Sequence, residues 1–241
     1  MSPFQGLWAL VTGASSGLGR ACANALAAEG AALLLAGRSK ERLGMVADEV
    51  REAGASGVST FAGNLAEDAA IEELTEAVGK LSRLDILMHS AGSISLGSVE
   101  TTPVAELDRQ IRVNLRAPYA LTRNLLQTLR ASAGQVVFFN SSVGKTARGG
   151  LIPYAASKHG LRALADGLRE EVNANGIRVL SVFLGRTATP MQEHVCALED
   201  VPYRPEQLIQ PSDVAVIVLA ALSLPRTVEV TDLHLRPMQK S

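Results

Sequence analysis

Short apolar runs alternate along the chain with longer segments whose apolar residues recur at helical spacing. The runs that predict strands cover residues 8–12, 32–36, 58–62, 86–89, 136–140, 178–183 and 227–231. The segments that predict helices cover residues 17–29, 40–53, 67–81, 104–131, 153–173 and 211–222. Several strands are apolar at successive positions, as strands buried on both faces are. The pattern therefore predicts an α/β protein with a parallel sheet of about seven strands and helices on both faces.

The domain organisation follows from the absence of any linker, repeat or low-complexity tract between these elements. We therefore expect one domain over residues 1–241. The least regular stretch is 185–210, which contains Pro190, Pro202 and Pro205. Long irregular segments in compact domains are often lids or binding loops, so we expect a substrate lid here; the alternative is a solvated connector.

Composition and charge exclude several classes of partner. The formal net charge is −1 and no basic stretch is present, which disfavours nucleic acid and anionic membranes as partners. Apolar runs such as 214–222 are too short to span a bilayer, and residues 1–6 lack a signal-peptide pattern. The only cysteines, Cys22 and Cys196, form no disulfide framework, and the four histidines show no metal-ligand spacing. These features predict a cytoplasmic protein without a metal site.

A glycine cluster joins the first strand to the first helix. Gly13, Gly17 and Gly19 have the spacing G-x-x-x-G-x-G rather than the commoner G-x-G-x-x-G. Glycines at such a turn let the backbone approach a pyrophosphate, and the N-terminus of the next helix attracts it. We therefore expect a dinucleotide to contact Gly13, Ser15, Ser16, Gly17, Leu18 and Gly19. The alternative is an ordinary turn.

The end of the second strand predicts which dinucleotide is bound. An acidic residue there would bind the ribose hydroxyls of NAD(H) and repel a 2′-phosphate. Residues 36–39 contain no acid but include Arg38, whose planar guanidinium suits a phosphate, and Arg42 follows one helical turn later. This favours NADP(H) over NAD(H). The alternative is that both arginines are ordinary surface residues.

A tyrosine and a lysine four residues apart supply candidate chemistry. Tyr154 and Lys158 fall within the segment expected to be helical, so their side chains share one face. A neighbouring ammonium favours the phenolate, and we expect it to lower the pKa of Tyr154. The alternative is a solvated helix face.

Together with residues 12–19, Asn114 and the pair Ser141-Ser142, this motif set resembles the short-chain dehydrogenase/reductase family over nearly the whole chain. The resemblance implies a doubly wound Rossmann-like fold and hydride transfer between a nicotinamide and a small carbonyl/alcohol pair. It implies that Tyr154 is the acid/base, and that Lys158 lowers the tyrosine pKa and binds the nicotinamide ribose. It also implies that a serine holds the substrate oxygen and that Asn114 supports a water relay. Of the two serines, we predict Ser142. The helices at 104–131 and 153–173 resemble the family's dimer-forming helices, which predicts a homodimer or homotetramer.

The sequence departs from the family pattern at three strand ends. His89-Ser90-Ala91-Gly92 replaces N-N-A-G, and we expect His89 to be a hydrogen-bonded structural residue. Leu184 replaces the proline of P-G-x-x-x-T, and Asn64 replaces an aspartate. The resemblance still assigns cofactor contacts to Asn64, Leu65, Ala91, Gly92, Gly185, Thr187 and Thr189.

The substrate pocket is expected between segments 93–98, 143–154 and 185–210. These supply the apolar residues Ile94, Leu96, Leu151, Ile152, Met191 and Val195, and the polar candidates Arg148, Arg186 and His194. Two other functions stay open. One is a non-catalytic NADP(H)-binding regulator, and the other is a sugar-nucleotide epimerase or dehydratase, which also uses a Tyr/Lys pair.

Overall fold

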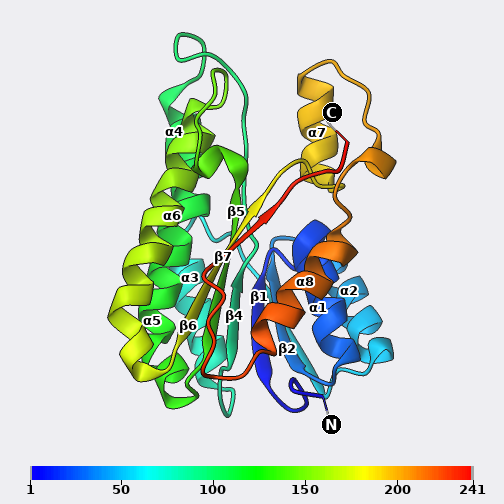
Figure 1. Ribbon diagram of the computed structural model, residues 1–241, viewed down its shortest axis with the longest axis vertical. Helices are drawn as coiled ribbons and strands as arrows, with labels where there is room; N and C mark the ends of the chain where they lie inside the picture. The colour runs from blue at the N-terminus through cyan, green and yellow to red at the C-terminus, as the bar shows by residue number, and fades with distance from the viewer. Residues whose placement is uncertain (1, 240–241) are drawn as a thin grey trace.

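The computed structural model describes residues 2–239, and within them seven parallel strands form one sheet (Figure 1). The strand order is β3-β2-β1-β4-β5-β6-β7. The strands are β1 (Trp8–Thr12), β2 (Ala32–Gly37), β3 (Gly57–Ala62), β4 (Ile86–His89), β5 (Gln135–Ser141), β6 (Arg178–Leu184) and β7 (Asp232–Leu235). The sequence-based prediction of a doubly wound Rossmann-like sheet is confirmed.

Helices cover both faces of the sheet (Figure 1). The sheet therefore separates two clusters of buried side chains, one on each face. Helices α1 (Gly17–Ala28), α2 (Lys40–Ala53) and α8 (Pro211–Leu222) pack on one face. Helices α3 (Asp68–Gly79), α5 (Ala117–Ala131) and α6 (Ile152–Val172) pack on the other. Because both faces are covered, every residue of β2 and β4 is buried, which explains why the residues before Gly37 in β2 and before His89 in β4 are all apolar.

The strand order reverses next to β1, which pairs with both β2 and β4. In open parallel sheets, the crevice at the carboxyl ends of the strands next to such a reversal is where ligands bind. The ends of β1, β4, β5 and β6 therefore place their terminal residues around one crevice.

The last strand lies later in the chain than predicted. The sequence suggested 227–231, but β7 is Asp232–Leu235 and pairs with Ser181–Leu184 of β6. It lies at the sheet edge and alternates between exposed and half-buried residues, so it lacks the apolar run that marks the inner strands.

Two further segments differ from the prediction. Stretch 185–210 is not irregular, because it contains α7 (Pro190–Leu198) and the 3₁₀ turn η4 (Pro205–Gln207). Pro190 stands at the start of α7, where a fixed φ is favourable, and the Thr189 side chain caps that helix. The expected helix 104–131 is divided into α4 (Val104–Ile111), the π-helical turn η1 (Arg112–Arg116) and α5. No helix in the described part of the chain is long and apolar enough to cross a membrane.

Candidate active site

A cleft of about 450 Å³ opens at the carboxyl ends of the central strands. This volume falls in the range of sites that hold small molecules, roughly 300–1,000 Å³. The predicted residues that line it are Gly13, Ser15, Ser16, Gly17, Leu18, Arg38, Asn64, Leu65, Ala91, Gly92, Ser142, Tyr154, Lys158, Gly185, Thr187 and Thr189. The predicted residues Gly19 and Asn114 are buried and are not among the lining residues.

The glycine turn is packed so closely that side chains are excluded from it. Gly13 has φ +65°, and a Cβ atom there would lie 2.8 Å from the Cα and N atoms of Ala91. A Cβ atom on Gly19 would lie within contact distance of the Gly13 carbonyl oxygen. The Thr12 hydroxyl donates to the Met88 carbonyl and accepts from the Ala91 N–H at 3.2 Å. The turn after β1 is thereby fixed against the end of β4.

The start of α1 leaves backbone donors at the cleft. The N-cap residue, Ser16, makes no side-chain capping hydrogen bond. The first N–H groups of a helix have no partner within the helix, and they carry its positive dipole end. Since Ser16, Gly17 and Leu18 line the cleft, this end of it suits an anionic group such as a pyrophosphate.

Arg38 follows the end of β2, is exposed and lines the cleft. Arg42 is also exposed but does not line it. Asn64 lines the same end, and its amide already donates to Glu67 and accepts from the Ala66 N–H. Of the two arginines, only Arg38 is therefore placed to bind a ligand in the cleft.

Tyr154 and Lys158 lie one turn apart on α6 and both line the cleft. The Lys158 ammonium is 5.8 Å from the Tyr154 ring centroid and donates to the Phe139 carbonyl at 2.8 Å. Burial lowers the pKa of Lys158 to about 8. Burial also raises the pKa of Tyr154 to about 12, although a hydrogen bond with the Ser141 side chain opposes that rise. In the chain without cofactor the tyrosine pKa is therefore raised rather than lowered, because burial outweighs the effect of the Ser141 side chain.

The serine beside Tyr154 is Ser141, not the predicted Ser142. Ser141 ends β5 and is half-buried, its hydroxyl accepts from the Val143 N–H at 3.3 Å, and its side chain lowers the pKa of the tyrosine. Ser142 begins the 3₁₀ turn η2 (Ser142–Gly144) and is exposed, although it also lines the cleft. Only Ser141 belongs to the strand, whereas Ser142 lies in the turn that follows it.

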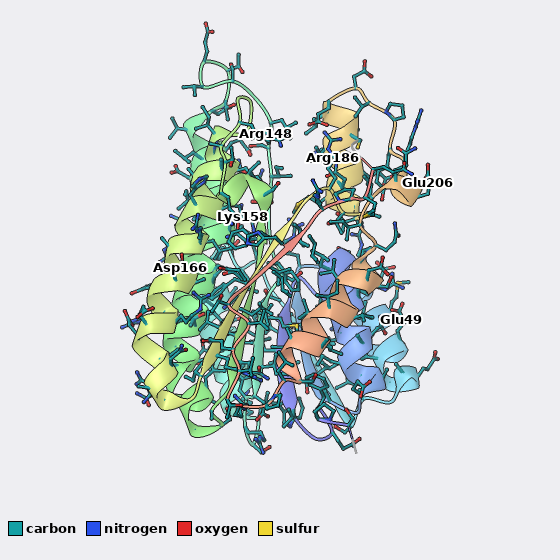
Figure 2. The ribbon with its side chains drawn as sticks, in the orientation of Figure 1. Glu49, Arg148, Lys158, Asp166, Arg186 and Glu206 are labelled. Carbon is teal, nitrogen blue, oxygen red and sulfur yellow. The ribbon has the colours of Figure 1, made fainter. Side chains whose placement is uncertain are left out.

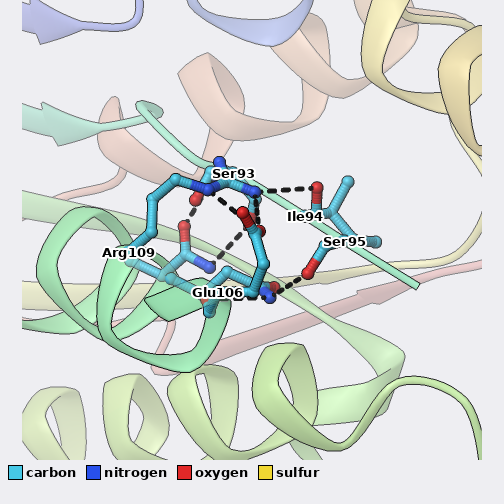
Figure 3. A network of polar contacts seen from close by, with 7 residues as sticks. Ser93, Ile94, Ser95, Glu106 and Arg109 are labelled. Carbon is cyan, nitrogen blue, oxygen red and sulfur yellow. Dashed lines mark hydrogen bonds and ion pairs between the residues drawn. The ribbon is translucent and has the colours of Figure 1, made fainter. Parts of the chain in front are cut away.

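Asn114 fixes the cleft wall from behind through its hydrogen bonds with Ser93, which is labelled in Figure 3. Its side chain accepts from the Ser93 N–H and donates to the Ser93 carbonyl, both at 2.8 Å. It also donates to the Ser157 hydroxyl at 3.0 Å, which in turn donates to the Tyr154 carbonyl. The amide thus ties the segment after β4 to the helix that carries the tyrosine.

His89 is a structural residue, as predicted. It is buried at the end of β4, its Nε2 lies 2.8 Å from the Thr122 hydroxyl, and its ring stacks on Phe138. Burial lowers its pKa to about 3, so the ring is neutral near pH 7.

The turn after β6 is held by hydrogen bonds despite the missing proline. The Gly185 N–H donates to the Leu235 carbonyl, and a Cβ on Gly185 would lie 2.9 Å from Pro237. The Thr187 hydroxyl donates to the Gly185 carbonyl, and the Thr189 hydroxyl to the Thr187 carbonyl. These contacts hold residues 185–189 along the cleft.

The far end of the cleft has mixed walls. The predicted Ile94, Leu151, Met191, Val195, Arg148 and Arg186 line it, whereas the predicted Leu96, Ile152 and His194 do not. Sequence reasoning missed Arg109 and Glu199. Arg109 precedes Asn114 by little more than one helical turn, a spacing that could have indicated it.

Comparison with known proteins agrees with this architecture. Residues 7–199 match the sequence profile of the short chain dehydrogenases, and the chain belongs to that family of oxidoreductases. It is 29% identical over 240 residues to an uncharacterized oxidoreductase of Staphylococcus saprophyticus, covering 99% of this chain and 100% of that protein. It is 32% identical over 234 residues to an uncharacterized oxidoreductase of Staphylococcus aureus, covering 95% and 96% respectively.

Two solved structures share the fold over almost their full length. The alcohol dehydrogenase of the archaeon Thermococcus sibiricus, complexed with 5-hydroxy-NADP, superposes with a TM-score of 0.88 at 28% identity, covering 98% of this chain and 99% of that one. A metagenomic short-chain oxidoreductase in complex with NADP superposes with a TM-score of 0.85 at 30% identity, covering 99% and 100%.

Proposed function

We propose that the protein is an NADP(H)-dependent oxidoreductase that interconverts a small carbonyl compound and its alcohol. One observation carries the proposal: a phenol, an ammonium and a hydroxyl, those of Tyr154, Lys158 and Ser141, line the same cleft as the glycine turn. The two solved structures named above were determined with NADP or a modified NADP, which supports the choice of cofactor.

The described residues fit a dinucleotide. Gly13 and Gly19 leave no space for side chains, so the backbone itself would meet the pyrophosphate, with the start of α1 supplying N–H donors. Arg38 would bind a 2′-phosphate. No carboxylate beside Arg38 would repel this phosphate, because the one acidic residue found to line the cleft, Glu199, lies in the far wall. When bound, the cofactor would supply or accept the hydride.

The side chains would manage the proton. With its pKa raised to about 12, Tyr154 carries its proton near pH 7 and can give it to the substrate oxygen during reduction. The Ser141 hydroxyl would bind the same oxygen as charge develops on it. The Lys158 ammonium would stabilise the phenolate that the proton transfer leaves behind. Asn114 would act as a positioning residue, since its side chain is committed to Ser93 and Ser157.

Three finer points belong to this proposal. Segment 185–210 would act as a lid, since α7 contributes Met191 and Val195 to the cleft wall. A cytoplasmic location agrees with Cys22 and Cys196, which are buried and unpaired. The assembly would be a homodimer or homotetramer.

The test is NADPH oxidation, followed optically, over aldehydes, ketones, diketones and oxo acids, with the NADP-driven reverse reaction on alcohols. We expect turnover on at least one class. Tyr154→Phe should lose at least about two orders of magnitude in kcat while still binding NADPH. Cofactor binding without hydride transfer to any compound would instead support a regulatory protein. NAD retained through purification would favour an epimerase or dehydratase.

A further inference from the structure

Cationic side chains line the cleft at its substrate end as well as at its phosphate end. The cationic residues that line it are Arg38, Arg109, Arg148, Lys158 and Arg186. Glu199 is the single acidic residue identified in that lining. Arg38 and Lys158 are assigned above to the cofactor and the proton transfer. Three arginines therefore remain around the space left for the substrate.

Two of these three arginines are already neutralised. Arg109 donates to the Glu106 carboxylate through Nε at 3.0 Å and Nη2 at 2.6 Å, and its Nη2 lies 3.4 Å from the Ile94 carbonyl (Figure 3). Arg186 donates to the Glu199 carboxylate at 2.7 Å. Neither charge is free for a ligand without first breaking an ion pair.

Arg148 is different, because its side chain makes no hydrogen bond or ion pair with any residue from 2 to 239. Figure 2 labels Arg148 and Arg186 on opposite sides of the opening above Lys158. Arg148 is exposed, so the simplest alternative is an ordinary solvated arginine. Its position in the cleft lining argues against that alternative.

The backbone around Arg148 is fixed relative to the reacting groups. The Arg148 carbonyl accepts from the Leu151 N–H, which closes a turn directly before α6. Gly150 has φ +76°, and its carbonyl accepts from the Gly97 N–H, which ties this turn to the segment after β4. Tyr154 follows six residues after Arg148 on the helix that this turn starts. The backbone of Arg148 is thus held at a fixed position relative to the helix that carries the phenol.

We propose that Arg148 binds a carboxylate on the substrate, so that the reaction interconverts an oxo acid and a hydroxy acid. This inference rests on the proposed function and names its substrate class. A guanidinium pairs with a carboxylate through two parallel N–H···O bonds, which a neutral carbonyl compound cannot form. One uncompensated cation matches the single charge of a carboxylate better than a phosphate, which carries about −1.5 to −2. The apolar side chains of Ile94, Leu151 and Met191 would contact the carbon chain between the two ends.

The test compares matched substrates with the full-length chain and NADPH. The substrates are a short oxo acid, its methyl ester and its phosphonate analogue. The ratio of kcat/KM for the acid to kcat/KM for each of the other two compounds reports recognition of the carboxylate. We expect the wild-type chain to prefer the acid, and Arg148→Gln to lower the acid-to-ester ratio roughly 10- to 100-fold, chiefly through KM. Arg148→Lys should recover part of the ratio. Arg123→Gln, an exposed arginine on α5 outside the cleft lining, is the matched control and should leave the ratio unchanged.

A binding measurement separates this inference from the proposed function. In the Tyr154→Phe chain loaded with NADPH, calorimetry should detect the oxo acid, and adding Arg148→Gln should weaken that binding to a similar degree. Equal use of acid and ester, with no effect of Arg148→Gln, would overturn the inference while the proposed function stands. Preference for the phosphonate would overturn the choice of carboxylate. Absence of turnover on every carbonyl would overturn the proposed function and this inference with it.

Discussion

The Ser141 hydroxyl at the end of β5 lies beside the phenol of Tyr154 on α6 and holds its pKa below the value that burial alone would give. The two residues come from different elements, and their contact depends on how α6 packs against the carboxyl end of the strand. Burial raises the pKa of the phenol, and the Ser141 hydroxyl opposes that rise. In the proposed reaction, this pair would bind and protonate the substrate oxygen.

The two adjacent serines give a matched pair of variants. Ser141→Ala should lower kcat by about 10²- to 10³-fold, because it removes a hydrogen bond to the oxygen on which charge develops. Ser142→Ala should change kcat by roughly twofold at most, as exposed substitutions usually do. Steady-state kinetics with NADPH and any accepted carbonyl compound checks both values. A larger loss in Ser142→Ala than in Ser141→Ala would restore the prediction made from sequence.

The choice between the two serines illustrates a general limit of sequence reasoning. The glycine turn, the Tyr154/Lys158 pair and the inner strands follow directly from local spacing and from runs of apolar residues. Whether Ser141 or Ser142 faces the phenol depends on where β5 ends and η2 begins, a boundary of one residue. Apolar patterning does not fix an element's end to that accuracy.

The remaining errors have similar physical causes. The edge strand β7 is half exposed, so segment 227–231, which is richer in β-branched residues, resembled a strand more closely. In stretch 185–210, Pro190 suggested a break although it opens α7. The π-helical turn around Asn114 alters backbone hydrogen bonding without altering the apolar pattern.

The close packing of the glycine turn predicts a strong effect of a single methyl group. Gly13→Ala would hold alanine at φ +65° with its Cβ 2.8 Å from Ala91, so unfolding free energy should fall by at least about 1–2 kcal/mol. NADPH should also no longer raise the Tm, because the glycine turn that would contact the pyrophosphate must move apart to admit the methyl group. Gly44→Ala on α2, whose Cβ would contact nothing within 4 Å, should instead stabilise the chain by about 0.5–1 kcal/mol. Thermal unfolding with and without NADPH measures both effects. If NADPH raised the Tm of Gly13→Ala as much as that of the wild-type chain, the assignment of the glycine turn to pyrophosphate binding would be contradicted.

The cofactor preference should depend on one arginine. Arg38→Ala should lower kcat/KM for NADPH about 10- to 100-fold, because a charged hydrogen-bond partner of the 2′-phosphate is lost. The value for NADH should change far less, since NADH lacks that phosphate. Arg42→Ala is the matched control, because Arg42 is a nearby exposed arginine that does not line the cleft. In this variant the ratio of kcat/KM for NADPH to kcat/KM for NADH should stay at the wild-type value. Equal or better use of NADH by the wild-type chain would overturn the NADP(H) assignment.

The buried imidazole of His89 should make the fold sensitive to acid. Burial lowers its pKa from 6.5 to about 3, so between these pH values the unfolded chain binds a proton that the folded chain does not. Unfolding free energy therefore falls as the pH drops through this window, by up to about 1.4 kcal/mol per pH unit for this one group. His89→Asn, which keeps a side chain able to hydrogen-bond Thr122, removes the titrating group. Urea unfolding at pH 7, 6 and 5 should show the wild-type chain losing stability faster than His89→Asn. Parallel pH profiles for the two chains would mean that the imidazole becomes protonated without unfolding the protein.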